Sequence, residues 1–372
     1  MCAAILKYFH LHVSTSIEKM APGILEAFGL PAECKIEPLT SGLINNTWKI
    51  TTGNDQFVLQ KINHQVFKKP FDIAANIRMV DDHLKEHAPQ YLFVSPIQTR
   101  DHREIYYNEA HGYFRLFPFV KGSQTINVVS TPEQAYEAAF HFGKFTRLLS
   151  DFDATKLYIA IPDFHNLTLR FRQFEDALIN GNANRIAESK LLINTIKSQS
   201  HIVTEFEKIK KDADVRLRVT HHDTKISNVL FDTNGKGICV IDLDTIMPGY
   251  FISDVGDMLR TYLSPANEEV KDFTEIDVRE DFFRAIVQGY ISTMGTALSA
   301  TEKKLIIYSG QFLIYMQAMR FLTDYINNDV YYGARYPEQN LVRAGNQLQL
   351  LNTLNDKAET LHKIVLDETG QS

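Results

Sequence analysis

The stretch of sequence that decides the fold covers residues 219–244 and reads VTHHDTKISNVLFDTNGKGICVIDLD. Two short runs of apolar and β-branched residues, Val229–Phe231 and Ile238–Ile241, flank a polar turn that contains two glycines. This arrangement predicts a β-hairpin. Because a hairpin folds the chain back on itself, polar residues just before its first strand should lie near those just after its second.

The polar residues at that end of the hairpin are two carboxylates and a carboxamide. Asp223 and Asn228 precede the first strand, and Asp242 follows the second. Oxygen ligands of this kind suit Mg²⁺ that bridges phosphate groups. The spacing of His221, Asp223 and Asn228, H-x-D-x-x-x-x-N, is that of a phosphoryl-transfer catalytic loop. We expect Asp223 to accept the proton of an acceptor hydroxyl, and Asn228 and Asp242 to hold the metal ion.

Two further residues of the loop have expected roles. Lys225 stands two residues after Asp223 and can reach a transferring phosphoryl group, although it could also be an ordinary exposed lysine. We expect His221 to orient the loop by hydrogen bonding rather than to titrate in the reaction.

The composition restricts the class of protein. The chain has 372 residues, of which 44% are apolar and 23% charged, and its formal net charge is −6. Such a mildly acidic protein is not expected to bind nucleic acid or anionic membranes by electrostatic attraction. Three scattered cysteines without a C-x-x-C pair argue against a disulfide framework or a cysteine-rich zinc site. We find no signal peptide and no apolar run long enough to span a membrane, so a cytoplasmic location is expected.

The pattern along the chain predicts two unequal lobes. Strand-like runs between residues 36 and 62 are separated by polar turns, as in an antiparallel meander, and residues 72–87 have helical spacing. Thr131-Pro132-Glu133-Gln134 is typical of a helix start, and an apolar stripe from Leu341 to Val365 at helical spacing predicts a helical C-terminal part packed on the core. The predicted fold class is therefore α+β.

We divide the chain into three parts on this basis. Residues 1–20 form an N-terminal extension, residues 21–120 a small β-rich lobe with one helix, and residues 121–372 a larger, mainly helical lobe. A site between the two lobes would be a favoured place for a ligand.

The segments His221–Asn228 and Ile241-Asp242 resemble those of the aminoglycoside phosphotransferase and choline kinase superfamily, the small-molecule relatives of protein kinases. His222 stands where protein kinases have arginine, and Asp242-Leu243-Asp244 replaces Asp-Phe-Gly. The resemblance implies a bilobal, protein-kinase-like fold and favours a small acceptor over a protein substrate.

Longer segments are similar to the N-acetylhexosamine 1-kinase branch of that superfamily. They are residues 41–47, 221–225, 241–249, 253–257 and 319–325, with Asn340-Leu341-Val342-Arg343 behind them. This resemblance implies transfer of the γ-phosphoryl group of ATP, with Mg²⁺, to the anomeric hydroxyl of GlcNAc or GalNAc.

The resemblance also implies roles for residues of the smaller lobe. Lys61 matches the lysine that grips the α- and β-phosphates, and Phe119 falls where the hinge holds adenine, although its ring could equally belong to the core. The loop that contains Ser41, Gly42, Asn46 and Thr47 should lie over the phosphates.

Other matched positions are structural or incomplete. Asp254 corresponds to an aspartate that anchors the catalytic loop. The glutamate expected to pair with Lys61 is missing, and either Asn76 or Asp81 could take its place.

The acceptor site is expected in the larger lobe. Beside Asp223, the candidates are Arg320, Asp324 and Tyr332, because charged groups bind sugar hydroxyls and an aromatic ring covers the apolar face. The alternative is that Arg320 and Asp324 form an ordinary i,i+4 ion pair on a solvated surface.

Three other interpretations stay open. The acceptor could be an aminoglycoside, another monosaccharide, homoserine or choline. The histidines and aspartates could form a metal-dependent phosphohydrolase site, but this leaves Lys61, Lys225 and the asparagine spacing unexplained. The missing glutamate could also mean a non-catalytic nucleotide-binding module.

Overall fold

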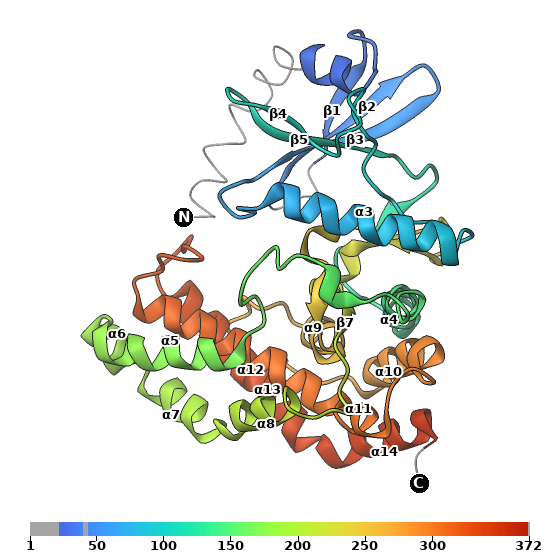
Figure 1. The fold of residues 1–372 in the computed structure, drawn as a ribbon. Helices are drawn as coiled ribbons and strands as arrows, with labels where there is room; N and C mark the ends of the chain where they lie inside the picture. The colour runs from blue at the N-terminus through green and yellow to red at the C-terminus, as the bar shows by residue number, and fades with distance from the viewer. Residues whose placement is uncertain (1–21, 40–43, 371–372) are drawn as a thin grey trace.

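A computed structural model describes residues 22–39 and 44–370, so the predicted extension 1–20 lies outside the described residues. The N-terminal part is built on an antiparallel five-stranded sheet (Figure 1). Its strands follow one another in the order β1-β2-β3-β5-β4: β1 Lys35–Leu39, β2 Asn46–Thr52, β3 Asp55–Ile62, β5 Gly112–Pro118 and β4 Tyr106–Asn108. The predicted meander is confirmed.

The two faces of this sheet belong to different cores. On one face, Trp48, Leu59 and Phe114 pack with a short helix at residues 22–27. On the other face, Ile62 joins the large core of the helical part. Since both faces of the sheet are covered, the strands have apolar residues among the side chains that point to either face.

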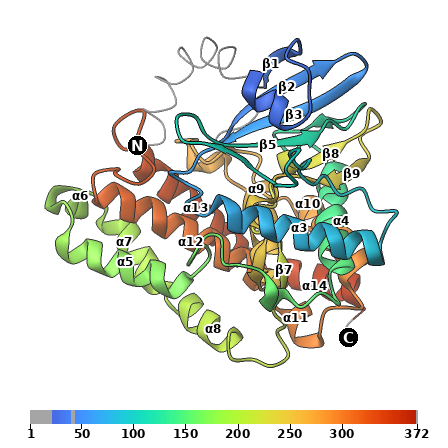
Figure 2. The same ribbon diagram turned by 45° about the horizontal axis from the view of Figure 1, so that its top comes forward.

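Helix α3 (Pro70–His87) lies between the sheet and the helical part (Figures 1 and 2). Its buried residues Ile73, Ile77, Val80 and Leu84 belong to the helical core rather than to the core under helix 22–27. The helix predicted over residues 72–87 is thus confirmed.

The C-terminal part is mainly helical. Its helices are α4 Pro132–Leu148, α5 Leu167–Asn180, α6 Ala183–Glu188, α7 Lys190–Ser198, α8 His201–Ile209, α9 Phe251–Tyr262, α10 Glu280–Met294, α11 Ala300–Lys304, α12 Ile306–Ile326, α13 Gln339–Asp356 and α14 Ala358–Thr369. Helix α4 begins as its sequence predicts, because the Thr131 side chain accepts a hydrogen bond from the Gln134 backbone N–H. Helix α12 is central and packs against α9 and α13.

Short strands carry the catalytic loop. They are β6 Gln124–Thr125, β7 Arg218–Thr220, β8 Val229–Phe231, β9 Gly237–Val240 and β10 Met247–Gly249. Strands β8 and β9 form the predicted hairpin, and β7 pairs with β10. Short 3₁₀ helices at Ile226–Asn228 and Leu243–Thr245 lie where the loop meets these strands.

The fold class is confirmed. The predicted apolar stripe from Leu341 to Val365 runs along two helices, α13 and α14, which meet at Lys357. Both helices bury their apolar residues in the same core. Within the described residues, no helix combines the length and apolar character needed to cross a membrane.

Candidate active site

The catalytic loop is held from below by helix α9. The Asp254 carboxylate accepts hydrogen bonds from the backbone N–H groups of His221 (3.1 Å) and His222 (2.7 Å). One turn later, Asp257 accepts the Thr224 backbone N–H at 2.9 Å. These bonds fix the backbone immediately before and after Asp223.

The backbone at this site is held in an uncommon conformation. His222 and Asp242 have positive φ angles, 66° and 60°. A positive φ is energetically unfavourable for a non-glycine residue, and it is found where surrounding contacts enforce it. Gly249 makes this possible for His222, because a Cβ at Gly249 would lie 2.5 Å from the His222 ring.

His221 is buried and its side chain connects the two ends of the hairpin. Its Nε2 lies 3.0 Å from the Ile241 carbonyl, and its Nδ1 lies 3.4 Å from the Asp223 backbone nitrogen. Burial lowers the pKa of His221. A neutral ring that donates through Nε2 and accepts at Nδ1 satisfies both contacts, which fits the orienting role expected from the sequence.

The loop held in this way brings together the side chains of Asp223, Lys225 and Asn228. The Lys225 ammonium lies 2.8 Å from Asp223 Oδ1, and the Asn228 amide donates to Asp223 Oδ2 at 3.1 Å. Burial alone would raise the pKa of Asp223, but the Lys225 charge and these hydrogen bonds outweigh it and lower that pKa. Asp223 is therefore ionised at neutral pH and can accept a proton.

Asp242 lies at the exit of the hairpin, as predicted. Loss of hydration among the surrounding protein, together with the negative charges of Asp244 and Asp223, raises the pKa of Asp242 to about 7. A cation placed here would relieve this repulsion.

The donor set fits a metal ion that arrives with phosphates. Because the Asn228 nitrogen donates to Asp223, its Oδ1 is left for a cation, and Asp242 adds a carboxylate. No cluster of three or more His, Cys, Asp or Glu side chains in the described chain could hold a metal on its own. One or two protein ligands completed by substrate phosphates is the usual arrangement for Mg²⁺.

Asp244 is held by residues of the N-terminal part, a contact that no pattern in the sequence predicts. Its carboxylate forms a buried ion pair with Arg115 of β5 and accepts a hydrogen bond from the Asn45 amide at 3.0 Å. Asn45 in turn accepts the Asn63 backbone N–H at 3.0 Å. The two parts of the molecule are thus joined at the second aspartate of Asp242-Leu243-Asp244.

Lys61 lies on the face of the sheet opposite to the one that meets Asp244. It lies opposite Phe114 and Asn46 in the sheet, and its Nζ is 5.8 Å from the centre of the Phe114 ring, on the face that packs with helix 22–27. Asn46 therefore shares that face, whereas Thr47 lies on the other one, opposite Gln60.

Neither expected partner of Lys61 contacts it. Asn76 binds the backbone of Tyr158 (2.9 and 2.8 Å) and the Ile246 carbonyl (3.0 Å). Asp81 pairs with Arg78 and Lys85, both at 2.7 Å. Both interpretations of the missing glutamate are therefore wrong.

The remaining nucleotide candidates are only partly described. Ser41 and Gly42 lie outside the described residues. The Phe119 backbone N–H binds the Gln56 carbonyl at 3.0 Å, and the Lys49 ammonium lies 4.5 Å from the centre of the Phe119 ring. Phe119 thus stands at the end of the sheet, where the chain crosses to the helical part.

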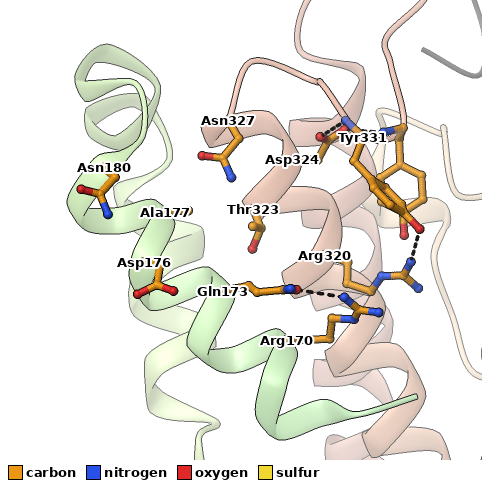
Figure 3. Close-up of a pocket in the computed structure, with 11 residues that line it drawn as sticks. Arg170, Gln173, Asp176, Ala177, Asn180, Arg320, Thr323, Asp324, Asn327 and Tyr331 are labelled. Atoms are coloured by element: carbon orange, nitrogen blue, oxygen red, sulfur yellow. Dashed lines mark hydrogen bonds between the residues drawn. The ribbon is translucent and has the colours of Figure 1, made fainter. Parts of the chain in front are cut away.

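The acceptor candidates line a cavity of about 450 Å³ between α5 and α12 (Figure 3). Arg320 and Tyr332 border it, and the alternative, an Arg320–Asp324 ion pair, is not formed between these two described residues. The Asp324 carboxylate instead accepts the backbone N–H groups of Tyr331 (2.7 Å) and Tyr332 (2.9 Å) and the Asn340 amide. Asp324 thereby fixes the loop that carries the two tyrosines.

Helix α5 supplies cavity residues that the sequence did not single out as strong candidates. Arg170 donates to Gln173 at 2.9 Å and to the Asp163 carbonyl, while its buried Nε has no partner among the described residues (Figure 3). Arg320 donates to Gln317 and Tyr331 at 3.3 Å each, and its guanidinium lies over the rings of Tyr331 and Tyr332. Two arginines without a carboxylate partner in the described chain therefore border the cavity.

A histidine just before α5 contacts the catalytic loop. His165 lies with its Nδ1 3.4 Å from Nδ1 of His222. Burial lowers the pKa of both histidines. Two neutral histidines therefore pack together where the segment before α5 meets the loop.

Comparisons with known proteins agree with this architecture. The model of the phosphotransferase enzyme family matches residues 35–293, which is most of the chain. A microcompartment-associated aminopropanol kinase is similar in structure (TM-score 0.61, 16% identity, 92% of this chain and 98% of that chain). So are choline kinase from Cryptosporidium parvum (0.57, 13%, 91% and 97%) and a spectinomycin phosphotransferase in complex with ADP and spectinomycin (0.53, 14%, 95% and 98%). At these identities the likeness concerns the fold.

Proposed function

The chain belongs to the phosphotransferase enzyme family, and from that premise we propose that it is an ATP-dependent sugar kinase. The acceptor we favour is the anomeric hydroxyl of an N-acetylhexosamine, which would become the 1-phosphate. As a member of this family the protein is a small-molecule phosphotransferase that acts on an alcohol group.

The charged residues of the cavity between α5 and α12 are the observation on which we base the choice of acceptor. Arg170 and Arg320 border it without a carboxylate partner in the described chain, and the one buried carboxylate there, Asp324, is occupied by backbone N–H groups. A cationic acceptor such as choline, an amino alcohol or an aminoglycoside would meet these two positive charges, and Asp176 is the one carboxylate of the lining that is left to pair with it. A polyhydroxylated ring would instead find guanidinium and amide donors and the rings of Tyr331 and Tyr332.

The catalytic loop supports the same chemistry. Asp223 is ionised and would take the proton of the acceptor hydroxyl as the new P–O bond forms, and Lys225 beside it would face the transferring phosphoryl group. Asn228 and Asp242 would hold Mg²⁺, which neutralises charge on the phosphates when bound. The non-catalytic alternative leaves this ionised Asp223–Lys225 pair without a use.

An acceptor panel tests the proposal. Purified protein with ATP and Mg²⁺ is offered GlcNAc, GalNAc, glucose, an aminoglycoside, homoserine and choline, and ADP release is measured. We expect turnover with the uncharged sugars and not with choline or the aminoglycoside. Turnover with a cationic acceptor alone would refute the sugar assignment, and ATP binding without turnover on any acceptor would refute the kinase assignment.

The position of the phosphate separates a 1-kinase from other sugar kinases. Phosphorus NMR of the product, together with loss of its reducing end, identifies an anomeric phosphate. The methyl glycoside of the best sugar is the matched control, because its anomeric oxygen is blocked. Equal turnover of the free sugar and its methyl glycoside would contradict the proposal.

A further inference from the structure

We propose that Arg115, and not Lys61, is the side chain of the N-terminal sheet that binds the phosphate groups of the nucleotide. The inference rests on the proposed function, since it presupposes a nucleotide bound between the sheet and the catalytic loop. It assigns a binding role to a strand β5 residue that belongs to none of the sequence motifs.

The pleat of the sheet separates the two side chains. Neighbouring residues of a strand point to opposite faces, and directly paired residues share a face. Lys61 is paired with Phe114, which packs toward helix 22–27. Gln60 is paired with Arg115, so these two share the face that meets Asp244 of the catalytic part.

The contacts of Arg115 fix the direction of its guanidinium. Its Nε and Nη2 donate to Gln60 Oε1 at 3.0 and 2.9 Å, and Nη1 pairs with Asp244. A guanidinium has five N–H groups. One N–H on each terminal nitrogen is therefore left without an acceptor in the described chain, and phosphate oxygens would accept from them.

The Arg115 guanidinium is held in place before any ligand arrives. Gln60 and Asp244 fix it on the sheet face that meets the catalytic part, and Asp244 is two residues from the proposed metal ligand Asp242. By contrast, no ion pair links Lys61 to a carboxylate of the described chain, and the only effect on its pKa is desolvation, which lowers it.

Lys49 is another cation of this sheet face. It is paired with Val58, two residues before Gln60, and its ammonium lies over the Phe119 ring. It is thus placed toward the adenine end expected from the sequence, at a distance from Asp244. Lys49 therefore lies on the same face of the sheet as Arg115 but away from Asp244.

The test measures nucleotide binding rather than turnover. Isothermal titration with ADP and with adenosine, both in EDTA, isolates contacts to the phosphates from contacts that pass through a metal ion. For Arg115→Met we expect ADP affinity to fall by about 10- to 100-fold, as loss of charge-assisted hydrogen bonds implies, with adenosine affinity unchanged. Lys61→Met should change ADP affinity by less than about twofold.

A second variant guards against misfolding, because Arg115→Met leaves the buried Asp244 carboxylate unpaired. Arg115→Lys keeps a positive charge for Asp244 but cannot bind phosphate bidentately. It should melt close to the wild-type protein and still lose about tenfold in ADP affinity. Wild-type ADP affinity in a folded Arg115→Lys variant, or a large loss of ADP affinity in Lys61→Met, would overturn the inference.

Failure of the proposed function gives a different result. If the wild-type protein binds neither ADP nor ATP, with or without Mg²⁺, the premise of a nucleotide site is wrong. If the wild-type protein binds ADP and both Arg115 variants bind it equally well, only the assignment of Arg115 is wrong.

Discussion

Removing the Lys225 charge should move the acid limb of the pH–rate profile to higher pH. The Lys225 ammonium lies 2.8 Å from Asp223 Oδ1 and contributes to the lowered pKa of Asp223. In Lys225→Met that contribution is lost, so the pKa of Asp223 rises. Activity that needs the ionised carboxylate is then lost at a higher pH as the solution is acidified.

The distance sets the size of the effect. Two unit charges at this separation attract by about 6 kcal/mol at an effective dielectric constant of about 20. The Lys225 side chain is 48% exposed, so solvent screens the pair. An effective dielectric constant of about 40 to 80 gives about 1.5–3 kcal/mol, or about one to two pH units.

The assay is the pH dependence of single-turnover phosphoryl transfer at saturating Mg²⁺, with Lys225→Arg as the charge-retaining control. A limb that belonged to Asp242 would move with Mg²⁺ concentration, because metal and proton compete for that carboxylate, whereas the Asp223 limb would not. We expect a shift of about one to two units for Lys225→Met and little shift for Lys225→Arg. An acid limb that stays in place in Lys225→Met would refute the electrostatic coupling and the role of Asp223 as base.

Three further predictions follow from the same geometry. Asp223→Asn should lower kcat by about 10²- to 10⁴-fold while the Kd for Mg-ATP stays within about twofold; unchanged kcat would remove Asp223 from the reaction. Because the pKa of Asp242 is raised to about 7, the carboxylate is protonated at pH 6 and ionised at pH 8. Mg-ADP affinity should therefore rise about tenfold over that range, relative to ADP in EDTA, and a flat difference would contradict this. Gly256→Ala should destabilise the protein by about 1–3 kcal/mol in urea unfolding, because its Cβ would lie 2.2 Å from the Ser309 carbonyl where α9 crosses α12; wild-type stability would show that this contact can relax.

The catalytic loop was predictable because its geometry is local. Residues 219–244 contain both strands of a hairpin and its turn, and Asp223, Asn228 and Asp242 come together once that hairpin forms. The start of α4 was predictable for the same reason, since the Thr131 cap and Gln134 are three residues apart.

The position of Arg115 was not predictable from the sequence. It depends on which residues of each strand face the catalytic loop and on a contact between distant segments. In β3, Leu59 and Ile62 are both buried although they point to opposite faces. Apolar spacing therefore does not reveal whether Gln60 or Lys61 faces the catalytic loop. The Arg115–Asp244 pair joins segments that are far apart in the sequence, and no local pattern indicates it.

The placement of α3 also determines how the molecule can be cut and recombined. Its apolar residues complete the helical core, and the buried Asn76 is bonded to the backbone at Tyr158 and Ile246. A chimaera made by exchanging everything before residue 121 with a relative would replace one wall of that core. An exchange that ends between β3 and α3 keeps α3 with its own partners and so preserves the helical core. The segment that can be exchanged without disturbing the helical core is thus smaller than the N-terminal part as a whole.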